Sequence, residues 1–116
     1  MVKLEKDEQK DVIKYCKANK IPVVASLNGV NIGGSRSKIA ITINSLKSQG
    51  MAVGFPDLMM FLKDKILFIE LKRIKDYVIK DNQREWIDKI NAFEYADAII
   101  CHGAEEAIKK IEEYLR

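Results

Sequence analysis

Asp57, Glu70 and Lys72 are charged residues that lie within or beside stretches expected to be buried. Residues 58–62 and 66–72 are apolar runs of strand length, and a short polar stretch separates them. This pattern predicts two strands joined by a tight turn. Alternation along the second strand places Glu70 and Lys72 on one face. Because both faces of that strand begin apolar, we expect a central strand covered on both sides.

The turn decides which residues of the two strands face each other. A turn at Lys63 to Lys65 with an even number of residues places Asp57 directly across from Glu70, with their Cβ atoms about 4.5–5.5 Å apart. Two carboxylates this close repel each other unless a proton or a cation lies between them. Oxygen ligands at this separation suit a hard divalent cation, Mg²⁺ or Mn²⁺, so the sequence predicts a metal site.

The chain has 116 residues, of which 47% are hydrophobic and 32% charged, and we expect residues 1–116 to form a single soluble domain. Its net charge of +3 permits a nucleic-acid partner without requiring one. No apolar run approaches the roughly 20 residues of a membrane span, and the polar N-terminus is unlike a signal peptide. We therefore expect a cytoplasmic protein, in which Cys16 and Cys101 are buried free thiols without CxxC spacing.

Helical and strand patterns follow one another along the whole chain. The predicted order is helix, strand, helix, strand, strand, helix, strand, helix, without repeats or interdomain linkers. This order fits an α/β fold in which a central mixed sheet of four strands is flanked by helices. Outside the hairpin, we expect helices over residues 4–19, 37–48, 81–92 and from 103 onward, and strands over residues 21–27 and 97–101.

The inward faces of these helices follow from helical spacing. In the first helix, Glu5 and Gln9 share a stripe with Val12 and Cys16, so two polar side chains should point inward. Alternatively, Glu5 lies in a frayed first turn and only complements the helix dipole. The other inward sets are Ile39, Ile43 and Leu46 in the second helix, Trp86, Ile87, Ile90 and Phe93 in the third, and Ala104, Ala107, Ile108, Ile111 and Leu115 in the fourth.

Polar residues near the helix ends have specific expected roles. Gly50 stands at the C-terminal cap position of the second helix, and Asp81 is expected to cap the third. Gln83 shares the face of Trp86, and a buried amide must either satisfy the backbone or reach a site. His102, the only histidine, stands at a strand-to-helix junction and is expected to be structural rather than catalytic.

Two basic segments each have two interpretations. The stretch 31–38, which contains Arg36 and Lys38, lacks the spacing of a phosphate-binding P-loop. It is either a loop whose serine caps the following helix, or a DNA-backbone contact in which glycines allow close approach. A second basic segment, either a solvated connection or a DNA contact beside the carboxylates, contains Arg73, Lys75 and Lys80.

The pattern Pro56-Asp57, a gap of twelve residues, and then Glu70-Leu71-Lys72 resembles the signature of the PD-(D/E)XK nuclease superfamily. More narrowly, the whole chain is similar to the virus-type replication-repair nuclease (VRR-NUC) domain. The resemblance implies a restriction-endonuclease-like core. It rests on four blocks in order: Glu5 and Gln9; Gly54, Pro56, Asp57 and Leu58; Glu70 and Lys72; and Gln83 and Trp86.

The resemblance implies metal-dependent hydrolysis of phosphodiester bonds in DNA. Asp57 and Glu70 would bind Mg²⁺ or Mn²⁺, with the Leu71 backbone carbonyl and Glu5 through water completing the ligand set. Glu8 is an alternative to Glu5 as the acidic residue of the first helix.

The other matched residues would act on the water and the phosphate. Lys72 would orient or deprotonate the attacking water and offset phosphate charge, and Gln83 would position Lys72 or the phosphate. The residues expected to contact DNA are Gln9, Arg36, Lys38, Arg73, Lys75 and Lys80.

Kinship also suggests the substrate. Stand-alone proteins of this kind resemble Holliday-junction resolvases, which act on four-way junctions as homodimers because two active sites related by a twofold axis suit such DNA. A phage origin, with action in the bacterial cytoplasm, is in keeping with the resemblance. The alternatives are a flap, nicking or restriction-type endonuclease, and a non-catalytic DNA-binding protein that retains the fold.

Overall fold

The computed structural model describes residues 3–26, 33–75 and 77–116, and over these residues the chain forms four helices and four strands. They follow the order expected from the sequence, α-β-α-β-β-α-β-α. The helices are α1 (Glu5–Ala18), α2 (Arg36–Ser48), α3 (Asp81–Asn91) and α4 (Ala104–Leu115), and the strands are β1 (Val23–Ala25), β2 (Leu58–Phe61), β3 (Ile66–Lys72) and β4 (Ala96–His102).

The strands form one mixed sheet in the order β1-β2-β3-β4. β2 pairs antiparallel with both β1 and β3, and β3 pairs parallel with β4, so β3 is an interior strand as predicted. Leu58 lies opposite Ile69 and Phe61 opposite Ile66. This is the register of the even-numbered turn, and its next pair brings Asp57 opposite Glu70.

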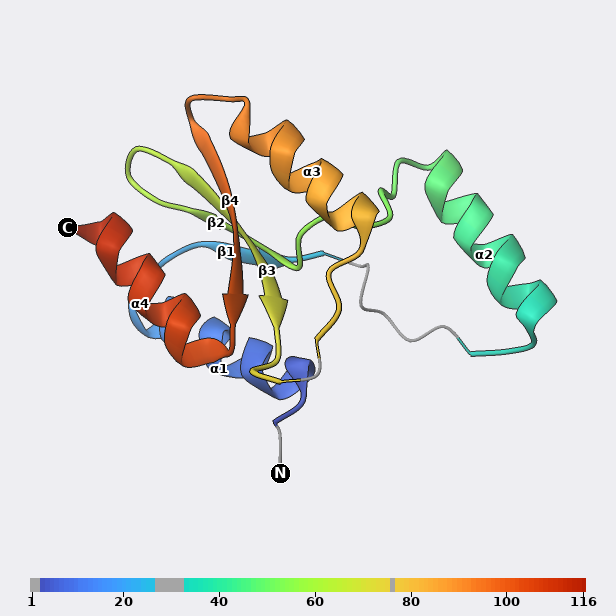
Figure 1. The fold of residues 1–116 in the computed structure, drawn as a ribbon, viewed down its shortest axis with the longest axis horizontal. Coiled ribbons are helices and arrows are strands. Elements are labelled where there is room, and N and C mark those ends of the chain that lie inside the picture. Colours follow the sequence, from blue (N-terminus) through green and yellow to red (C-terminus); the bar gives the residue numbers. More distant parts are fainter. Residues whose placement is uncertain (1–2, 27–32, 76) are drawn as a thin grey trace.

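Helices cover both faces of the sheet (Figure 1), which confirms the predicted α/β architecture with a restriction-endonuclease-like core. One face packs α1 and α4 against the buried side chains of Leu67, Ile69 and Leu71. The other face packs α3 against Phe68, which lies in a second apolar cluster with Ile90. Since β3 contributes alternate residues to both clusters, it is buried along almost its whole length.

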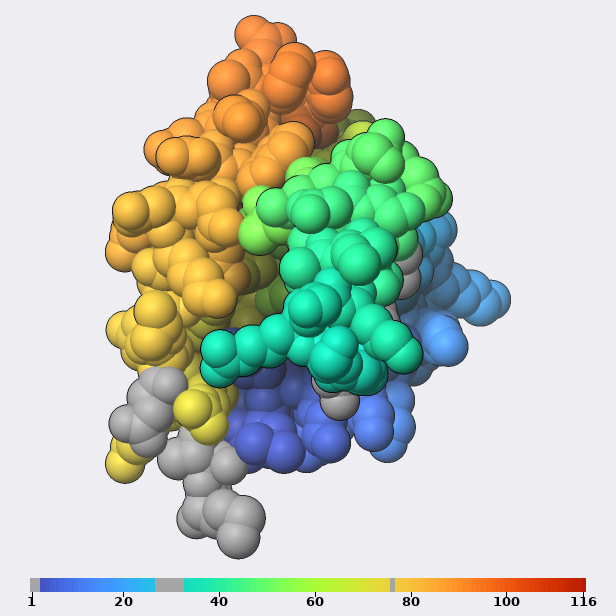
Figure 2. All heavy atoms as spheres, turned by 90° about the vertical axis from the view of Figure 1, so that its right-hand side faces the viewer, coloured from blue at the N-terminus to red at the C-terminus, as the bar shows by residue number. Residues whose placement is uncertain are grey.

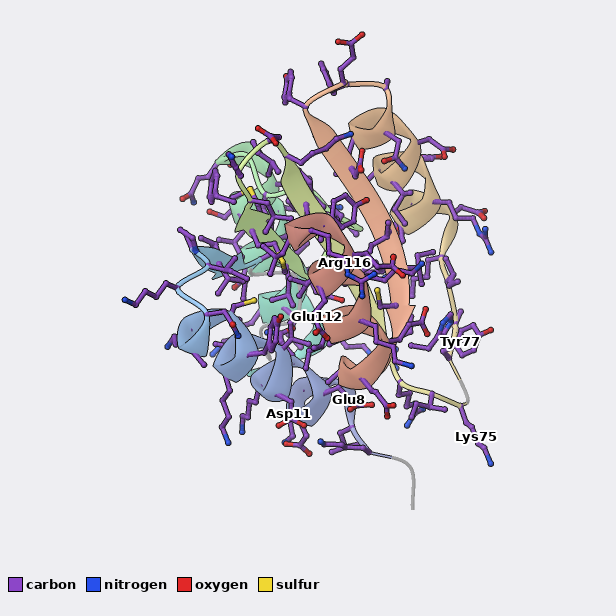
Figure 3. The ribbon with its side chains drawn as sticks, turned by 90° about the vertical axis from the view of Figure 1, so that its left-hand side faces the viewer. Glu8, Asp11, Lys75, Tyr77, Glu112 and Arg116 are labelled. Atoms are coloured by element: carbon purple, nitrogen blue, oxygen red, sulfur yellow. The ribbon has the colours of Figure 1, made fainter. Side chains whose placement is uncertain are left out.

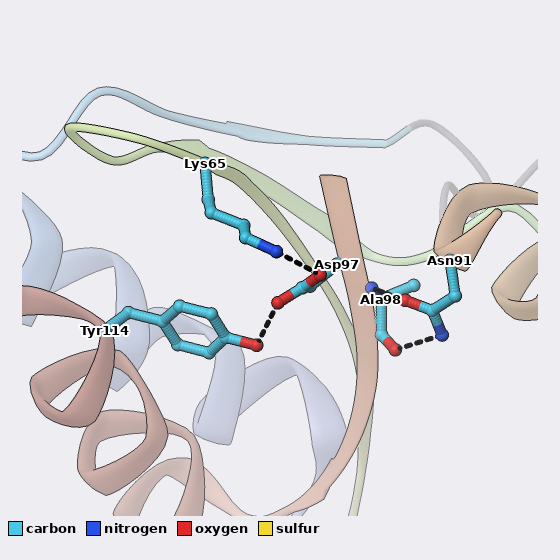
Figure 4. A network of polar contacts seen from close by, with 5 residues as sticks. All are labelled: Lys65, Asn91, Asp97, Ala98 and Tyr114. Atoms are coloured by element: carbon cyan, nitrogen blue, oxygen red, sulfur yellow. Dashed lines mark hydrogen bonds and ion pairs between the residues drawn. The ribbon is translucent and has the colours of Figure 1, made fainter. Parts of the chain in front are cut away.

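Polar contacts hold β4 at its N-terminal end (Figure 4). The Asp97 carboxylate accepts a hydrogen bond from the Tyr114 hydroxyl at 2.7 Å and from Lys65 Nζ at 3.0 Å. These two contacts, the Tyr114 hydroxyl above all, lower the pKa of Asp97. The Asn91 side chain pairs with the backbone N–H and carbonyl of Ala98, at 2.7 and 3.0 Å. Because β4 is an edge strand, this amide satisfies backbone groups that no further strand would reach.

The helix α2 projects away from the sheet (Figure 1), and none of its residues is buried. Its predicted inward residues, Ile39, Ile43 and Leu46, are half-buried, whereas Ile41 is 68% exposed. Both ends of the helix are capped. Ser35 Oγ accepts a hydrogen bond from the Lys38 backbone N–H at 3.3 Å, as one interpretation of this loop expects, and Gly50 follows the helix with φ +106°.

The C-terminal end of α2 borders a cleft of about 440 Å³, lined by residues that include Leu46, Met51, Phe55 and Trp86.

Three expectations about element ends are wrong. Asp81 is the first helical residue of α3 rather than its cap, because Gln83 Oε1 accepts a hydrogen bond from the Lys80 backbone N–H at 2.9 Å and starts the helix one residue earlier. Phe93 lies beyond the end of α3, where helical spacing no longer applies, and it is exposed. Leu115 is exposed as the last residue of α4.

Other expectations concern the first strand, the thiols and the membrane. β1 is shorter than the predicted 21–27, and residues 27–32, including the expected turn at Asn28-Gly29, lie outside the described residues. Cys16 and Cys101 are buried free thiols, as predicted. Among the helices of the described ranges, none has the length and apolar character needed to cross a bilayer.

Gly54 and Gly50 offer a matched test of close packing. Both have positive φ, +86° and +106°, but a Cβ on Gly54 would lie 2.7 Å from the Asn82 carbonyl carbon, whereas on Gly50 it would meet no described atom within 4 Å. We predict that Gly54→Ala lowers the free energy of unfolding by about 1–3 kcal/mol more than Gly50→Ala does. Chemical denaturation of both variants measures the difference, and equal losses would contradict a packing constraint at Gly54.

Candidate active site

Asp57 is held at the point where β2 begins. Its Oδ2 accepts a hydrogen bond from the Leu71 backbone N–H at 2.7 Å, and its backbone carbonyl accepts one from the Ser26 N–H at 2.8 Å. These contacts tie Asp57 to the strands on either side of β2. Together with the hairpin register, they place its carboxylate beside that of Glu70, as the sequence predicted.

Glu70 and Lys72 lie on the sheet face that α3 covers. Phe68, two residues before Glu70, belongs to the cluster under α3, whereas Leu71 belongs to the opposite core, so alternation assigns both charged residues to the α3 face. Glu70 is 2% exposed and Lys72 is 8% exposed. The Lys72 Nζ lies 3.5 Å from Glu70 Oε1, so each buried charge has an opposite charge nearby.

Burial raises the pKa of both carboxyl groups. The pKa of Glu70 rises to about 8, first because the group is buried and second because Asp57 is close, and the nearby Lys72 opposes the shift. Burial also raises the pKa of Asp57, while the hydrogen bond from the Leu71 N–H opposes the shift. Without a cation, the pair therefore retains a proton near neutral pH.

The donor atoms of the acid pair fit a divalent metal ion. Glu70 Oε2 is buried and has no hydrogen-bond partner among the described residues, which is costly unless another group satisfies it. Two neighbouring carboxylates supply the hard oxygen ligands that Mg²⁺ and Mn²⁺ prefer. Within residues 3–26, 33–75 and 77–116, no group of three or more His, Cys, Asp or Glu side chains is close enough to form a metal site. Further ligands would therefore come from backbone carbonyls, water or a phosphate.

Glu5 does not occupy the inward position predicted for it. It is exposed at the start of α1, which extends past the ends of the strands (Figure 1), so helical phase alone does not bury it. The buried residues of α1 are Glu8, Val12 and Cys16. Gln9, the other polar residue predicted to face inward, is half-buried. The acidic residue that α1 turns toward the protein is therefore Glu8.

Glu8 binds the start of α4 rather than the acid pair. Its Oε1 accepts a hydrogen bond from the Ala104 N–H at 3.3 Å and lies 3.8 Å from Lys3 Nζ. Figure 3 shows Glu8 beside the first turn of α4. A carboxylate at a helix N-terminus satisfies a free N–H group and interacts favourably with the helix dipole. Glu8 thus fixes the junction between β4 and α4.

Gln83 is half-buried in the first turn of α3, the helix that covers Glu70 and Lys72. Its side-chain carbonyl is used in capping, since Oε1 accepts the Lys80 N–H. A role at the site would therefore fall to its amide nitrogen. Trp86 and Ile87, predicted to share its face, are half-buried as well.

The basic residues expected to contact DNA lie on two segments. Figure 2 shows the N-terminal half of α2 and the connection from β3 to α3 on either side of a recess, with the green and yellow segments of β2 and β3 behind it. Arg36 and Lys38 are exposed at the start of α2. The opposite segment carries Arg73, which is half-buried, and Lys75 and Lys80, which are exposed.

Three further polar residues stand out in the structure: Ser26 and Asn82, which the sequence did not single out, and His102, which it predicted to be structural. In addition to Glu70 Oε2, the buried side-chain atoms without a partner in the described chain are Ser26 Oγ, Asn82 Oδ1 and His102 Nε2. Ser26 is bonded to Asp57 through its backbone, and Asn82 packs on Gly54. Such atoms are typical of a site that binds water, an ion or a ligand. No local pattern distinguishes Ser26 or Asn82 from an ordinary loop or helix residue.

The sequence profile of the VRR-NUC domain family matches residues 5–105. The chain belongs to this family. The match covers α1, α2, α3 and all four strands of the sheet, and it makes this VRR-NUC domain a nuclease of the PD-(D/E)XK type. A solved structure of a VRR-NUC domain protein superposes with a TM-score of 0.70 at 20% identity, covering 96% of this chain and 87% of that one, and this agreement confirms the fold. No curated protein matches the chain.

The raised pKa of Glu70 makes stability depend on pH. Between the usual pKa of a glutamate and about 8, the folded VRR-NUC domain holds a proton that the unfolded chain releases. The free energy of unfolding of the metal-free domain should therefore fall as pH rises from about 5 to about 8. Glu70→Gln, which cannot ionise, should flatten this decline.

Thermal unfolding in the presence of a chelator, from about pH 5 to pH 8, tests this expectation. Asp97→Asn is the control, because the pKa of Asp97 is lowered rather than raised and its removal should leave the decline in place. Identical slopes for wild type and Glu70→Gln would contradict the assignment.

Proposed function

We propose that this VRR-NUC domain is a Mg²⁺- or Mn²⁺-dependent, structure-specific DNA endonuclease that resolves four-way junctions as a homodimer. The observation that carries the proposal is the group formed by the half-buried Asp57 and the buried Glu70 and Lys72. The pKa of each of its two carboxyl groups is raised, and the Nζ of the buried Lys72 lies 3.5 Å from Glu70 Oε1. Perturbed carboxyl groups beside a lysine are typical of catalytic sites.

The metal ligands would be the carboxylates of Asp57 and Glu70 and the backbone carbonyl of Leu71. A divalent cation bound by these oxygens polarises a phosphate and lowers the pKa of a bound water. The Leu71 N–H keeps the Asp57 carboxylate in place for this role. Glu5, exposed on α1, remains a predicted ligand through water.

Lys72 would orient or deprotonate the attacking water and offset the charge that builds up on the phosphate. Its position suits both roles, because its ammonium is buried and adjoins a ligand carboxylate without itself binding metal. The amide nitrogen of Gln83, on the helix above, would position Lys72 or the phosphate. The ordered arrangement of these groups would supply much of the rate acceleration.

The charge of the two basic segments and the symmetry of a homodimer support the proposed substrate. The two basic segments on either side of the recess in Figure 2 suit contacts with the sugar-phosphate backbone, which position DNA without reading sequence. A homodimer would present two such sites related by a twofold axis, in agreement with the symmetry of a four-way junction.

Substitution of the central residues tests the chemistry. We predict that Asp57→Ala and Lys72→Ala each lower the cleavage rate by at least about 10²- to 10⁴-fold while DNA affinity changes little. Lys63→Ala, which removes an exposed lysine from the hairpin turn, is the matched control and should retain activity. Cleavage assays and fluorescence anisotropy measure the two properties. Full activity in purified Asp57→Ala would refute the assignment.

A panel of DNA substrates tests the specificity. With Mg²⁺ or Mn²⁺, we expect cleavage of a four-way junction in preference to linear, nicked and flap DNA, and a dimer in sedimentation at the assay concentration. Preference for flaps or nicks would identify a different structure-specific nuclease, and cleavage of linear duplex at one sequence would identify a restriction-type enzyme. Binding without cleavage of any substrate would favour a non-catalytic DNA-binding protein. A monomer would contradict the resolvase proposal.

A further inference from the structure

His102 lies beside Lys72 on the nuclease face of the sheet. The parallel pairing of β3 and β4 places the two residues opposite each other at the ends of their strands. Ala96 and Ala98 pack under α3, and Cys101 lies in the opposite core. Alternation along β4 therefore assigns the imidazole to the face that carries Lys72.

The imidazole is held from several sides. Its ring lies against that of Tyr77, with the centroids 4.4 Å apart, and its Nδ1 is 3.7 Å from Glu106 Oε2. The same carboxylate accepts a hydrogen bond from the His102 backbone N–H at 3.3 Å. Figure 3 shows Tyr77 beside the C-terminal end of β4, close to where α4 begins. These contacts limit how far the ring can turn.

The backbone that carries His102 is also constrained. The Gly103 N–H donates a hydrogen bond to the Lys72 carbonyl at 2.7 Å, and Glu8 accepts the N–H of Ala104. Gly103 has φ +89°, a conformation that favours glycine, and a Cβ there would lie 2.8 Å from Glu8 Oε2. The β4–α4 junction is therefore tied to the end of β3 and to α1, and it keeps the histidine in register with Lys72.

Nε2, the other ring nitrogen of His102, is buried and has no hydrogen-bond partner among the described residues. A carboxylate next to Nδ1 favours the tautomer with the proton on Nδ1, which leaves Nε2 as an acceptor. The neighbouring Lys72 ammonium has three donors, and its contact with Glu70 at 3.5 Å is longer than a good hydrogen bond. A buried acceptor and a buried donor with spare capacity thus belong to residues that are paired across β3 and β4.

We propose that His102 is a positioning residue for Lys72, whose ammonium donates a hydrogen bond to His102 Nε2 directly or through one water. The inference rests on the proposed function, because Lys72 needs positioning only if it acts on the attacking water. Glu70 Oε1 lies 3.5 Å from Lys72 Nζ, and Glu70 is also a proposed metal ligand. A second acceptor keeps the ammonium in place when the Glu70 oxygens are engaged, and it avoids leaving a buried charge unpaired.

NMR tests the contact without relying on nuclease activity. Because His102 is the only histidine, ¹⁵N-histidine labelling reports a single imidazole. In the metal-free domain at constant pH, we expect the Nδ1–H tautomer. The Nε2 resonance should shift in Lys72→Met, which removes the ammonium and keeps most of the unbranched side chain, and stay unchanged in Lys63→Ala. An Nε2 resonance unaffected by Lys72→Met, or an Nε2–H tautomer, would overturn the proposal.

Two substitutions at His102 separate positioning from structural support. His102→Phe keeps a ring against Tyr77 but removes the acceptor, and we expect it to lower kcat by about 10- to 100-fold with DNA affinity within about twofold of wild type. His102→Gln restores a polar group near the Nε2 position and should recover most of the lost rate. Equal losses in both variants together with a lowered Tm, or a wild-type kcat in His102→Phe, would refute the role.

The outcomes also separate this proposal from the proposed function. If Asp57→Ala still cleaves DNA, the nuclease assignment fails, whatever the state of the imidazole. If Asp57→Ala is inactive and the His102 Nε2 resonance does not shift in Lys72→Met, the nuclease assignment is supported and the proposed role of His102 is refuted.

Discussion

Two carboxylates that are kept together in the interior are the constraint around which the structure is arranged. Asp57 and Glu70 share the end of an otherwise apolar hairpin. Burial raises the pKa of both carboxyl groups, and the nearby Asp57 raises the pKa of Glu70 further. Such an arrangement opposes folding unless a proton or a cation neutralises it. The domain tolerates it because the Leu71 N–H binds one carboxylate and the Lys72 ammonium lies beside the other.

The two faces of the sheet differ in composition, because one is apolar and the other carries the charged groups of the candidate site. The face under α1 and α4 contains a continuous apolar cluster that includes Leu67, Ile69 and Leu71. The opposite face has a smaller cluster around Phe68 and then changes to Glu70 and Lys72 toward the end of β3. Alternation places both sets of residues on β3. The apolar core on one face of the sheet therefore stabilises the strand whose other face carries Glu70 and Lys72.

Glu8 links the first helix to the end of β3 through backbone hydrogen bonds. It caps α4 directly after the junction that contains Gly103, and this junction is bonded to the Lys72 carbonyl. A residue far away in the sequence therefore anchors the junction that is bonded to the strand end carrying Lys72.

The sequence by itself determined the features that depend on local pattern. The order of elements, the hairpin register and the pairing of Asp57 with Glu70 follow from alternation and turn length, which act over a few residues. The same local rules misplaced Glu5 and Phe93, because helical phase predicts neither where a helix extends past its neighbours, as at Glu5, nor where it ends, as before Phe93. Only the tertiary structure decided that Glu8 caps α4 and that His102 lies beside Lys72. Both contacts join segments that are distant in the chain, and such pairings depend on the packing of the whole sheet rather than on any spacing within one segment.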